Sequence, residues 1–144
     1  MKVPFKPGTL IYPLPAVMVT CGDCEENYNI ITIGWTGTIC SDPPMCYISV
    51  RKERHSHDLI MKNKEFVINL TTEELAAATD WCGVRSGRDF NKFKEMHLHA
   101  EPAQMVKAPT FNDSLDQVIE NEKANSKIKC MDDLLNSGST WTID

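Results

Sequence analysis

Residues 29–56 of this chain read NIITIGWTGTICSDPPMCYISVRKERHS, and this stretch decides the fold. Two runs rich in β-branched and aromatic residues, Asn29–Thr38 and Met45–Val50, predict strands. The prolines within residues 42–44 predict a turn between the two strands, because proline cannot donate to a ladder. Together with the apolar run Val17–Cys21 upstream, these segments predict an antiparallel meander rather than βαβ units, since short turns join them.

A dense basic loop follows the second of these strands, in a chain whose formal net charge is −5. Arginine beside serine hydroxyls and backbone N–H groups suits a phosphate dianion, because the guanidinium group offers a forked set of donors. Small hydroxylated side chains upstream suit a flat ring, and a phosphate at one end with a ring at the other indicates a mononucleotide cofactor. The cations are Arg51, Lys52 and Arg54, and the upstream residues are Thr32, Thr36, Thr38 and Ser41. The alternative is a solvated, charged connection between a strand and a helix.

Composition narrows the class of protein. A length of 144 residues predicts one domain. The acidic balance argues against a general nucleic-acid binder, and no apolar run approaches the length of a membrane helix. The N-terminus is broken by prolines and lacks a signal-peptide core, so we expect a cytoplasmic protein without a membrane partner. Its six cysteines are then expected to be reduced thiols: Cys21, Cys24, Cys40, Cys46, Cys82 and Cys130.

Beyond the basic loop, helices and strands are expected to alternate. Ser56 is a suitable N-cap for a short helix over residues 57–63, and residues 65–70 form an apolar run typical of a strand. Further along the chain, the spacing of Thr71 and Glu74 predicts a capping box.

That capping box would open a helix over residues 75–81, which Gly83 would end. Another short helix is expected over residues 88–96, before an extended segment over residues 97–105. From Asn112 onward the pattern changes, because Ser114 can cap a helix that carries Leu115, Val118 and Ile119 on one face.

At these residues the chain resembles the flavin reductase-like, FMN-binding split-barrel proteins, and within them the flavoredoxin-like branch. The resemblance covers roughly residues 8–109, and the order and spacing of the matching segments carry it. These segments are PLPAVMVT (13–20), the stretch 29–56, EFVINL (65–70), CGVRSGRDFNKF (82–93) and VKAP (106–109).

The resemblance implies a mainly β fold, a split β-barrel with short helices, for residues 1–111. Residues 112–144 are interpreted as a divergent, helix-leaning tail of the same domain. Relatives continue with further barrel strands, so the barrel is expected to be shortened at its C-terminus. The resemblance also implies a homodimer that holds FMN non-covalently near the subunit interface.

The resemblance also implies three groups of cofactor-binding residues. The ring and ribityl chain would be lined by Asn29, Thr32, Trp35, Thr36, Cys40 and Ser41. The phosphate would be held by Ser49, Arg51, Arg54 and Ser56, with His55 nearby. Ser86, Gly87 and Lys92 would approach the flavin from a separate turn.

The expected function is acceptance of hydride or electrons at FMN and their transfer to an acceptor, with NAD(P)H or a redox protein as donor. The flavin carries this chemistry, so no side chain is nominated as catalytic and no metal is expected. One alternative is a shortened, non-enzymatic relative that binds flavin weakly or binds another phosphorylated ligand. Another is a cysteine-based redox or zinc protein, suggested by Cys21 and Cys24 and by the pairs His55/His57 and His97/His99.

Overall fold

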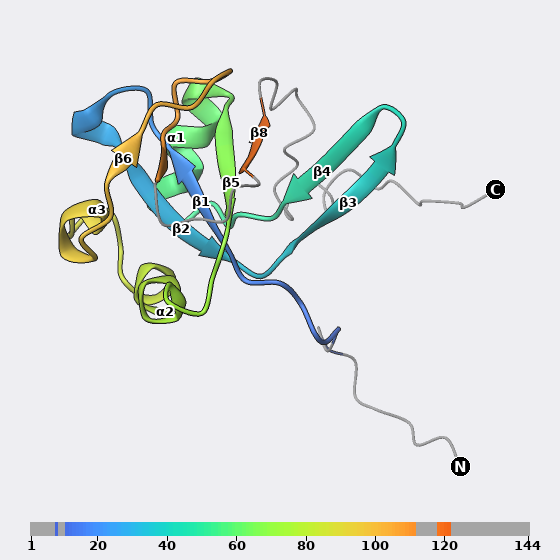
Figure 1. Cartoon of the computed structure of the whole chain (residues 1–144), viewed down its shortest axis with the longest axis horizontal. Helices are drawn as coiled ribbons and strands as arrows, with labels where there is room; N and C mark the ends of the chain where they lie inside the picture. Colours follow the sequence, from blue (N-terminus) through green and yellow to red (C-terminus); the bar gives the residue numbers. More distant parts are fainter. Residues whose placement is uncertain (1–7, 9–10, 112–117, 122–144) are drawn as a thin grey trace, which may run out of the picture.

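A four-stranded antiparallel sheet forms the centre of the protein, with strands in the order β2-β1-β5-β8 (Figure 1). The computed structural model describes residue 8, residues 11–111 and residues 118–121. The strands are β1 (Val17–Cys21), β2 (Asn29–Ile33), β5 (Phe66–Leu70) and β8 (Val118–Asn121). The predicted strands at residues 17–21 and 65–70 are therefore confirmed, and β2 is an edge strand of this sheet.

β1 and β2 form the hairpin that begins the predicted meander, with Val17 opposite Ile33 and Cys21 opposite Asn29. The connection contains Gly22, whose φ of +111° is a conformation that L-residues rarely adopt, and the short 3₁₀ helix η1 (Glu25–Asn27). The side chain of Asn27 accepts from the backbone N–H groups of Asp23 and Cys24 at 2.8 and 3.2 Å. These contacts fix the turn that sets the register of the two strands.

The predicted single strand over Asn29–Thr38 is wrong in one respect, because it is interrupted after Ile33. The chain turns out of the sheet at Gly34 and Trp35 and continues as β3 (Thr36–Ser41), which pairs with β4 (Pro44–Ile48). This β3–β4 hairpin extends away from the main sheet (Figure 1). The turn predicted at the prolines is found at its tip.

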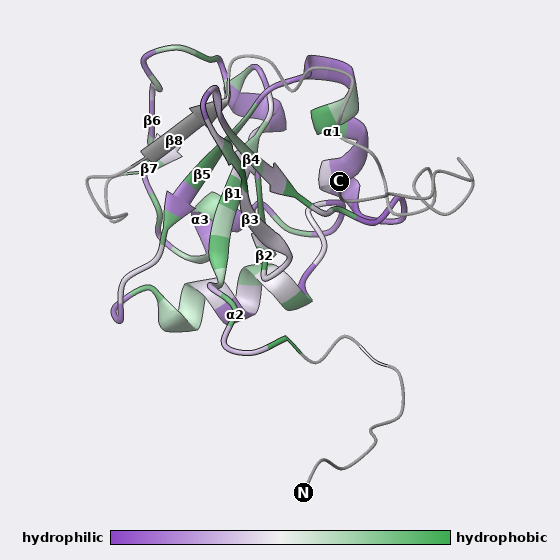
Figure 2. Cartoon of the chain, turned by 90° about the vertical axis from the view of Figure 1, so that its right-hand side faces the viewer, coloured by the Kyte–Doolittle hydropathy of each residue, from purple (hydrophilic) through white to green (hydrophobic). Residues whose placement is uncertain are grey.

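Both faces of the main sheet are covered, which explains why every residue of β1 is buried. Helix α1 (His55–Asn63) packs on one face, with Ile60 against Val17, Val19 and other apolar residues. Helices α2 (Ala76–Val84) and α3 (Lys92–Glu95) pack on the other, over Met18 and Ile30. Figure 2 shows the hydrophobic colour concentrated in the strands.

Several predicted helix boundaries need correction. The N-cap of α1 is Arg54, and Ser56 is the second residue inside the helix. Thr71 does not cap α2, because its hydroxyl donates to the Ala16 carbonyl at 2.8 Å and so ties the start of β1 to the end of β5. Gly83 lies within α2, where it faces Thr32 on β2.

A small ladder of β6 (Ala100–Glu101) and β7 (Thr110–Phe111) lies beside the sheet and is joined to it by buried polar contacts. Asn69 of β5 is fully buried; its amide donates to the Met18 carbonyl at 3.0 Å and accepts from Thr110 at 2.9 Å. The Thr20 hydroxyl donates to the Pro109 carbonyl.

The segment around Val118 forms a strand, not the predicted helix. Residues 118–121 are β8, which pairs with β5 and places Ile119 opposite Ile68. This pairing satisfies backbone N–H and C=O groups at the edge of β5, and the gain outweighs the local helical pattern of the segment. Ser114 and Leu115 of the same prediction lie outside the described residues, and the boundary at residue 112 stays a prediction. Among the described residues, no helix has both the length and the apolar character needed to cross a membrane.

Candidate functional site

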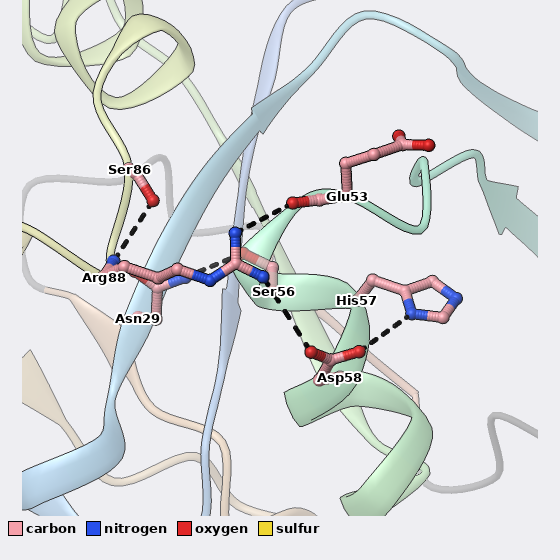
Figure 3. Close-up of polar contacts among 7 residues, drawn as sticks. All are labelled: Asn29, Glu53, Ser56, His57, Asp58, Ser86 and Arg88. Carbon is pink, nitrogen blue, oxygen red and sulfur yellow. Dashed lines mark hydrogen bonds and ion pairs between the residues drawn. The ribbon is translucent and has the colours of Figure 1, made fainter.

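A pocket of about 240 Å³ lies at the edge of β2. Because β2 is an edge strand, segments from both faces of the sheet can contribute residues to this pocket. The basic loop and the first turn of α1 approach from one side, and the connection between α2 and α3 approaches from the other (Figure 3). The lining residues are Asn29, Ile31, Arg51, Glu53, Arg54, His55, Ser56, Cys82, Arg85, Ser86, Gly87, Arg88 and Lys92.

Cations dominate the lining of the pocket, although the chain as a whole is acidic. Five side chains carry positive charge and one carries negative charge: Arg51, Arg54, Arg85, Arg88 and Lys92, against Glu53. Arginines supply forked donors that match the oxygens of a phosphate group. The pocket is therefore suited to an anion with several oxygens.

Ser56 lies on the pocket side of the first turn of α1 and is 2% exposed. Asn29 on β2 donates from Nδ2 to Ser56 Oγ at 2.7 Å (Figure 3). Ser56 Oγ is thus an acceptor for Asn29, and the Cys21 thiol is a second polar neighbour of this hydroxyl group. The backbone N–H groups at this helix start add partial positive charge on the same side.

The opposite wall is the turn at Ser86 and Gly87. Gly87 approaches β2 so closely that an added Cβ would lie 2.2 Å from Asn29 Oδ1 and 2.9 Å from His55 Cδ2. Ser86 Oγ accepts from the backbone N–H of Arg88 at 3.2 Å, which holds the turn in shape. Glycine is required here because there is no room for a side chain.

Arg88 connects the two walls of the pocket (Figure 3). Its Nη1 donates to the Glu53 carbonyl in the basic loop at 3.0 Å, and its Nη2 lies 4.0 Å from Asp58 Oδ2. The loop is thus held against the turn after α2. Arg88 is itself half exposed, so its contact with Asp58 is screened by water and contributes little to stability.

Lys92 and Cys82 both line the pocket, and the buried Cys21 thiol lies near Lys92 without lining it. The Lys92 side chain is 3% exposed, and its Nζ donates to the Cys82 carbonyl at 2.7 Å. Burial lowers the pKa of Lys92, while burial raises the pKa of Cys82 to about 11 and that of Cys21 to about 12. Both thiols therefore remain protonated near neutral pH and are poor nucleophiles.

His55 also contributes to the electrostatics of the pocket. Burial and then the positive charge of Arg88 lower the pKa of His55, and Asp58 partly offsets them. His55 is therefore mostly neutral at neutral pH in the ligand-free protein.

The structure brings together more than half of the residues predicted to bind the cofactor. Those that line the pocket are Asn29, Arg51, Arg54, His55, Ser56, Ser86, Gly87 and Lys92. The sequence analysis missed Arg88, Arg85, Glu53, Cys82 and Ile31. The position of Arg88 directly after Ser86 and Gly87 was the available signal for it.

The other predicted residues do not line the pocket: Thr32, Trp35, Thr36, Cys40, Ser41 and Ser49. Thr32 faces α2, where its hydroxyl donates to the Thr79 carbonyl. The Thr36 hydroxyl donates to the Tyr47 carbonyl at 2.6 Å within the β3–β4 hairpin, and Cys40 contacts the Asp42 carbonyl at the hairpin tip. Trp35 is 39% exposed and accepts from the Ser49 N–H at 2.8 Å.

The cysteine and histidine pairs lie apart from this pocket, with the exception of His55. Cys24 is exposed whereas Cys21 is buried, and both are free thiols. His97 and His99 line a second, more open hollow of about 720 Å³ beside α3. Across the described ranges, no three His, Cys, Asp or Glu side chains gather closely enough to hold a metal ion.

Comparison with known proteins places this architecture among characterised folds. The sequence model of the flavin reductase like domain matches residues 9–122. The structure is similar to flavoredoxin of Desulfovibrio vulgaris (Miyazaki F), with a TM-score of 0.77, 30% identity, and coverage of 83% of this chain and 65% of that one. The predicted fold class, a mainly β split barrel with short helices, is confirmed by this similarity.

Two other relatives extend the comparison. The FMN-binding protein from Thermus thermophilus with bound 1-cyclohex-2-enone has a TM-score of 0.69 and 21% identity, over 83% of this chain and 64% of its own. An uncharacterized protein of Pyrococcus abyssi is 28% identical over 109 residues, which are 76% of this chain and 62% of that protein. The chain spans between 56% and 62% of the length of three curated relatives that it matches.

Proposed function

This chain belongs to the flavin reductase-like domain family, and on that basis we propose that it binds FMN and works as a flavoprotein. The solved relatives named as flavoredoxin and FMN-binding protein support this ligand. In this proposal the protein accepts hydride or electrons at the flavin and passes them to an acceptor. NAD(P)H or a redox protein is the proposed donor, and the cytoplasm is the proposed location.

The observation that carries the proposal is the cationic pocket at the edge of β2. Its donors match the phosphate of FMN: Arg51 and Arg54 from the basic loop, and the Ser56 hydroxyl at the start of α1. On the opposite wall, Ser86 and the backbone at Gly87 add hydrogen-bonding groups at a position where a side chain would block the approach. The residues present therefore fit the phosphate end of the cofactor.

The ring of the flavin requires more space than this pocket gives. Pockets that enclose a small molecule have roughly 300–1,000 Å³, and this one has about 240 Å³. We therefore assign the phosphate to the pocket and place the ring outside it. A second copy of the chain would complete the ring site, in keeping with the proposed homodimer.

The exposed side chains of the β3–β4 hairpin support such a dimer. Ile39, Tyr47 and Met45 are 58%, 45% and 38% exposed, and Trp35, directly before β3, is 39% exposed. Apolar side chains grouped on a projecting hairpin are typical of a contact surface. Sedimentation analysis of the protein with and without FMN tests this assignment, and a monomer in both samples would contradict it.

FMN, when bound, supplies the electron-transfer chemistry of this proposal. In this proposal the residues of the chain bind the phosphate and orient the cofactor along β2. The buried thiols near the pocket are protonated at neutral pH, so the proposal gives them no nucleophilic role. Whether the protein serves as an electron carrier or as an NAD(P)H:flavin reductase depends on the donor and acceptor, which activity assays with each candidate donor would identify.

A second candidate function is the binding of another phosphorylated ligand without redox chemistry. The observation that favours it is the separation of the predicted ring-lining residues, such as Thr36 and Cys40, from the phosphate pocket. A ligand without a flavin ring would need only the pocket.

An absorbance spectrum of the freshly purified protein distinguishes the two candidates. We expect flavin bands, and we expect FMN to be the chromophore that denaturation releases. A colourless protein that also fails to bind added FMN would reject the flavoprotein and favour the second candidate.

A further inference from the structure

The ammonium group of Lys92 is buried next to the pocket without a carboxylate partner in the described part of the chain. Lys92 is 3% exposed, and the one acceptor that the described residues offer its Nζ is the Cys82 carbonyl at 2.7 Å. A lysine ammonium carries three donors. Two of them are therefore left for a partner that the described residues do not provide.

An isolated buried charge is costly, and a buried ammonium is normally paired or loses its proton. Within the described ranges, the titratable groups that face Lys92 do not supply negative charge. They are the Cys21 thiol on β1, the Cys82 thiol on α2, and Arg54 and His55 before and at the start of α1. Arg54 adds a like charge, which makes the protonated form of Lys92 less favourable still.

We propose that Lys92 is a proton-linked binding residue, whose missing counter-ion is the dianion bound in the pocket. In the ligand-free protein part of the Lys92 population is neutral at alkaline pH. A bound phosphate group restores the charged form, so binding takes up a proton from solvent onto Nζ. The inference rests on the proposed function for the identity of the anion, but it concerns the anion site alone.

The pKa directions of the neighbouring groups agree with this assignment. Burial lowers the pKa of Lys92 below the ordinary 10.5. A bound anion would raise this pKa again, because it stabilises the charged form of the ammonium group. Cys82 and Cys21, with pKa values raised to about 11 and about 12, keep their protons across the pH range below 10.5. His55 has a pKa below the ordinary 6.5, so it contributes mainly at lower pH.

Calorimetry with sulfate tests the proposal, because sulfate is a dianion that does not itself titrate at these pH values. Binding is measured from about pH 7 to about pH 10 in pairs of buffers with different ionisation enthalpies, which gives the number of protons taken up. The unmodified protein should take up a fraction of a proton at a maximum below pH 10.5. Its sulfate affinity should fall with pH, by at most about tenfold per pH unit.

Three variants separate Lys92 from other groups. Lys92→Arg keeps the charge at every pH, so it should bind sulfate without proton uptake in the alkaline range. Lys92→Met should bind sulfate more weakly, with an affinity that does not change with pH there. Lys94→Met removes an exposed lysine of α3 outside the pocket lining, so it should leave the alkaline proton uptake unchanged, and circular dichroism checks that each variant is folded.

Proton uptake that persists in both Lys92 variants, or no uptake by the unmodified protein, would overturn the proposal. The same titrations with FMN keep this result apart from the proposed function. FMN binding without proton uptake would reject the role of Lys92 and retain the flavoprotein. Sulfate binding with the expected uptake, but no FMN binding, would retain the role of Lys92 and reject the flavoprotein.

Discussion

Replacing Gly87 with alanine tests the packing on which the pocket depends. The new Cβ would lie 2.2 Å from Asn29 Oδ1, far inside van der Waals contact. Asn29 has little freedom to move away, because it is 4% exposed and donates to Ser56 at 2.7 Å. The added methyl group must therefore displace the Ser86–Gly87 turn or break the hydrogen bond between Asn29 and Ser56.

The cost of either response can be worked out from these contacts. Overpacking a buried site costs about 1–3 kcal/mol, and a lost hydrogen bond about 0.5–1.5 kcal/mol. We therefore expect Gly87→Ala to lower the free energy of unfolding by about 1–3 kcal/mol. FMN affinity should fall by about tenfold or more, because Ser56 and the turn would no longer meet the phosphate together.

Urea denaturation and FMN titration measure the two effects, and Gly34→Ala is the matched control. A Cβ at Gly34 would meet nothing within 4 Å, so this variant should stay within about 0.5 kcal/mol of the parent. Equal stability of the two variants, together with unchanged FMN affinity for Gly87→Ala, would refute the packing argument.

Three further predictions concern single side chains. Arg54→Ala should weaken FMN binding by about 1.5–3 kcal/mol, as expected for the loss of a hydrogen bond to a charged group. Lys52→Ala, outside the pocket lining, should change FMN binding little. Equal effects of the two substitutions in a binding titration would show that Arg54 is not part of the phosphate site. Asn69→Ala should lower the free energy of unfolding by about 2–4 kcal/mol in urea, because it removes the bonds to Met18 and Thr110, and a loss well under 1 kcal/mol would contradict this role. For the ligand-free proteins, the free energy of unfolding of the unmodified protein minus that of Lys92→Met should rise with pH between the lowered pKa of Lys92 and the ordinary 10.5. In this pH range Lys92 binds more protons in the unfolded chain than in the folded protein. A difference that does not change with pH would contradict a lowered Lys92 pKa.

Local sequence patterns predicted the sheet well where burial on both faces determines the strands. β1 and β5 are runs of buried residues that leave few alternatives to a central strand, and the prolines fixed the hairpin tip. The interruption after Ile33 was not predictable from the same cues. The β-branched pattern continues through it, and only the pairing of β2 with β1 shows that the chain leaves the sheet there.

The candidate site, like the sheet, was predicted only where local residue types carry the signal. The basic loop and the Ser86–Gly87 turn could be identified because their residue types suit a phosphate. Asn29, predicted to line the ring and ribityl chain, lies in the pocket beside Ser56. Arg88 and Cys82 were missed because their contribution depends on the distance between α1 and the turn after α2, which no local pattern contains.

The strand at residues 118–121 shows how pairing across a sheet can outweigh a local pattern. The spacing of Leu115, Val118 and Ile119 favours a helix, but the edge of β5 offers backbone partners. The described part of the chain therefore has a sheet of four strands, one more than the segments before residue 112 could supply alone.

The measurement that tests the central claim most directly is a comparison of FMN and riboflavin binding to cofactor-free protein. The two ligands differ only in the phosphate, so their affinity ratio reports the contribution of the cationic pocket. We predict that FMN binds at least about tenfold more tightly than riboflavin, a difference of about 1.4 kcal/mol or more, and that added sulfate reduces the difference. Equal affinities for FMN and riboflavin, or no binding of FMN, would contradict the assignment of the pocket as its phosphate site.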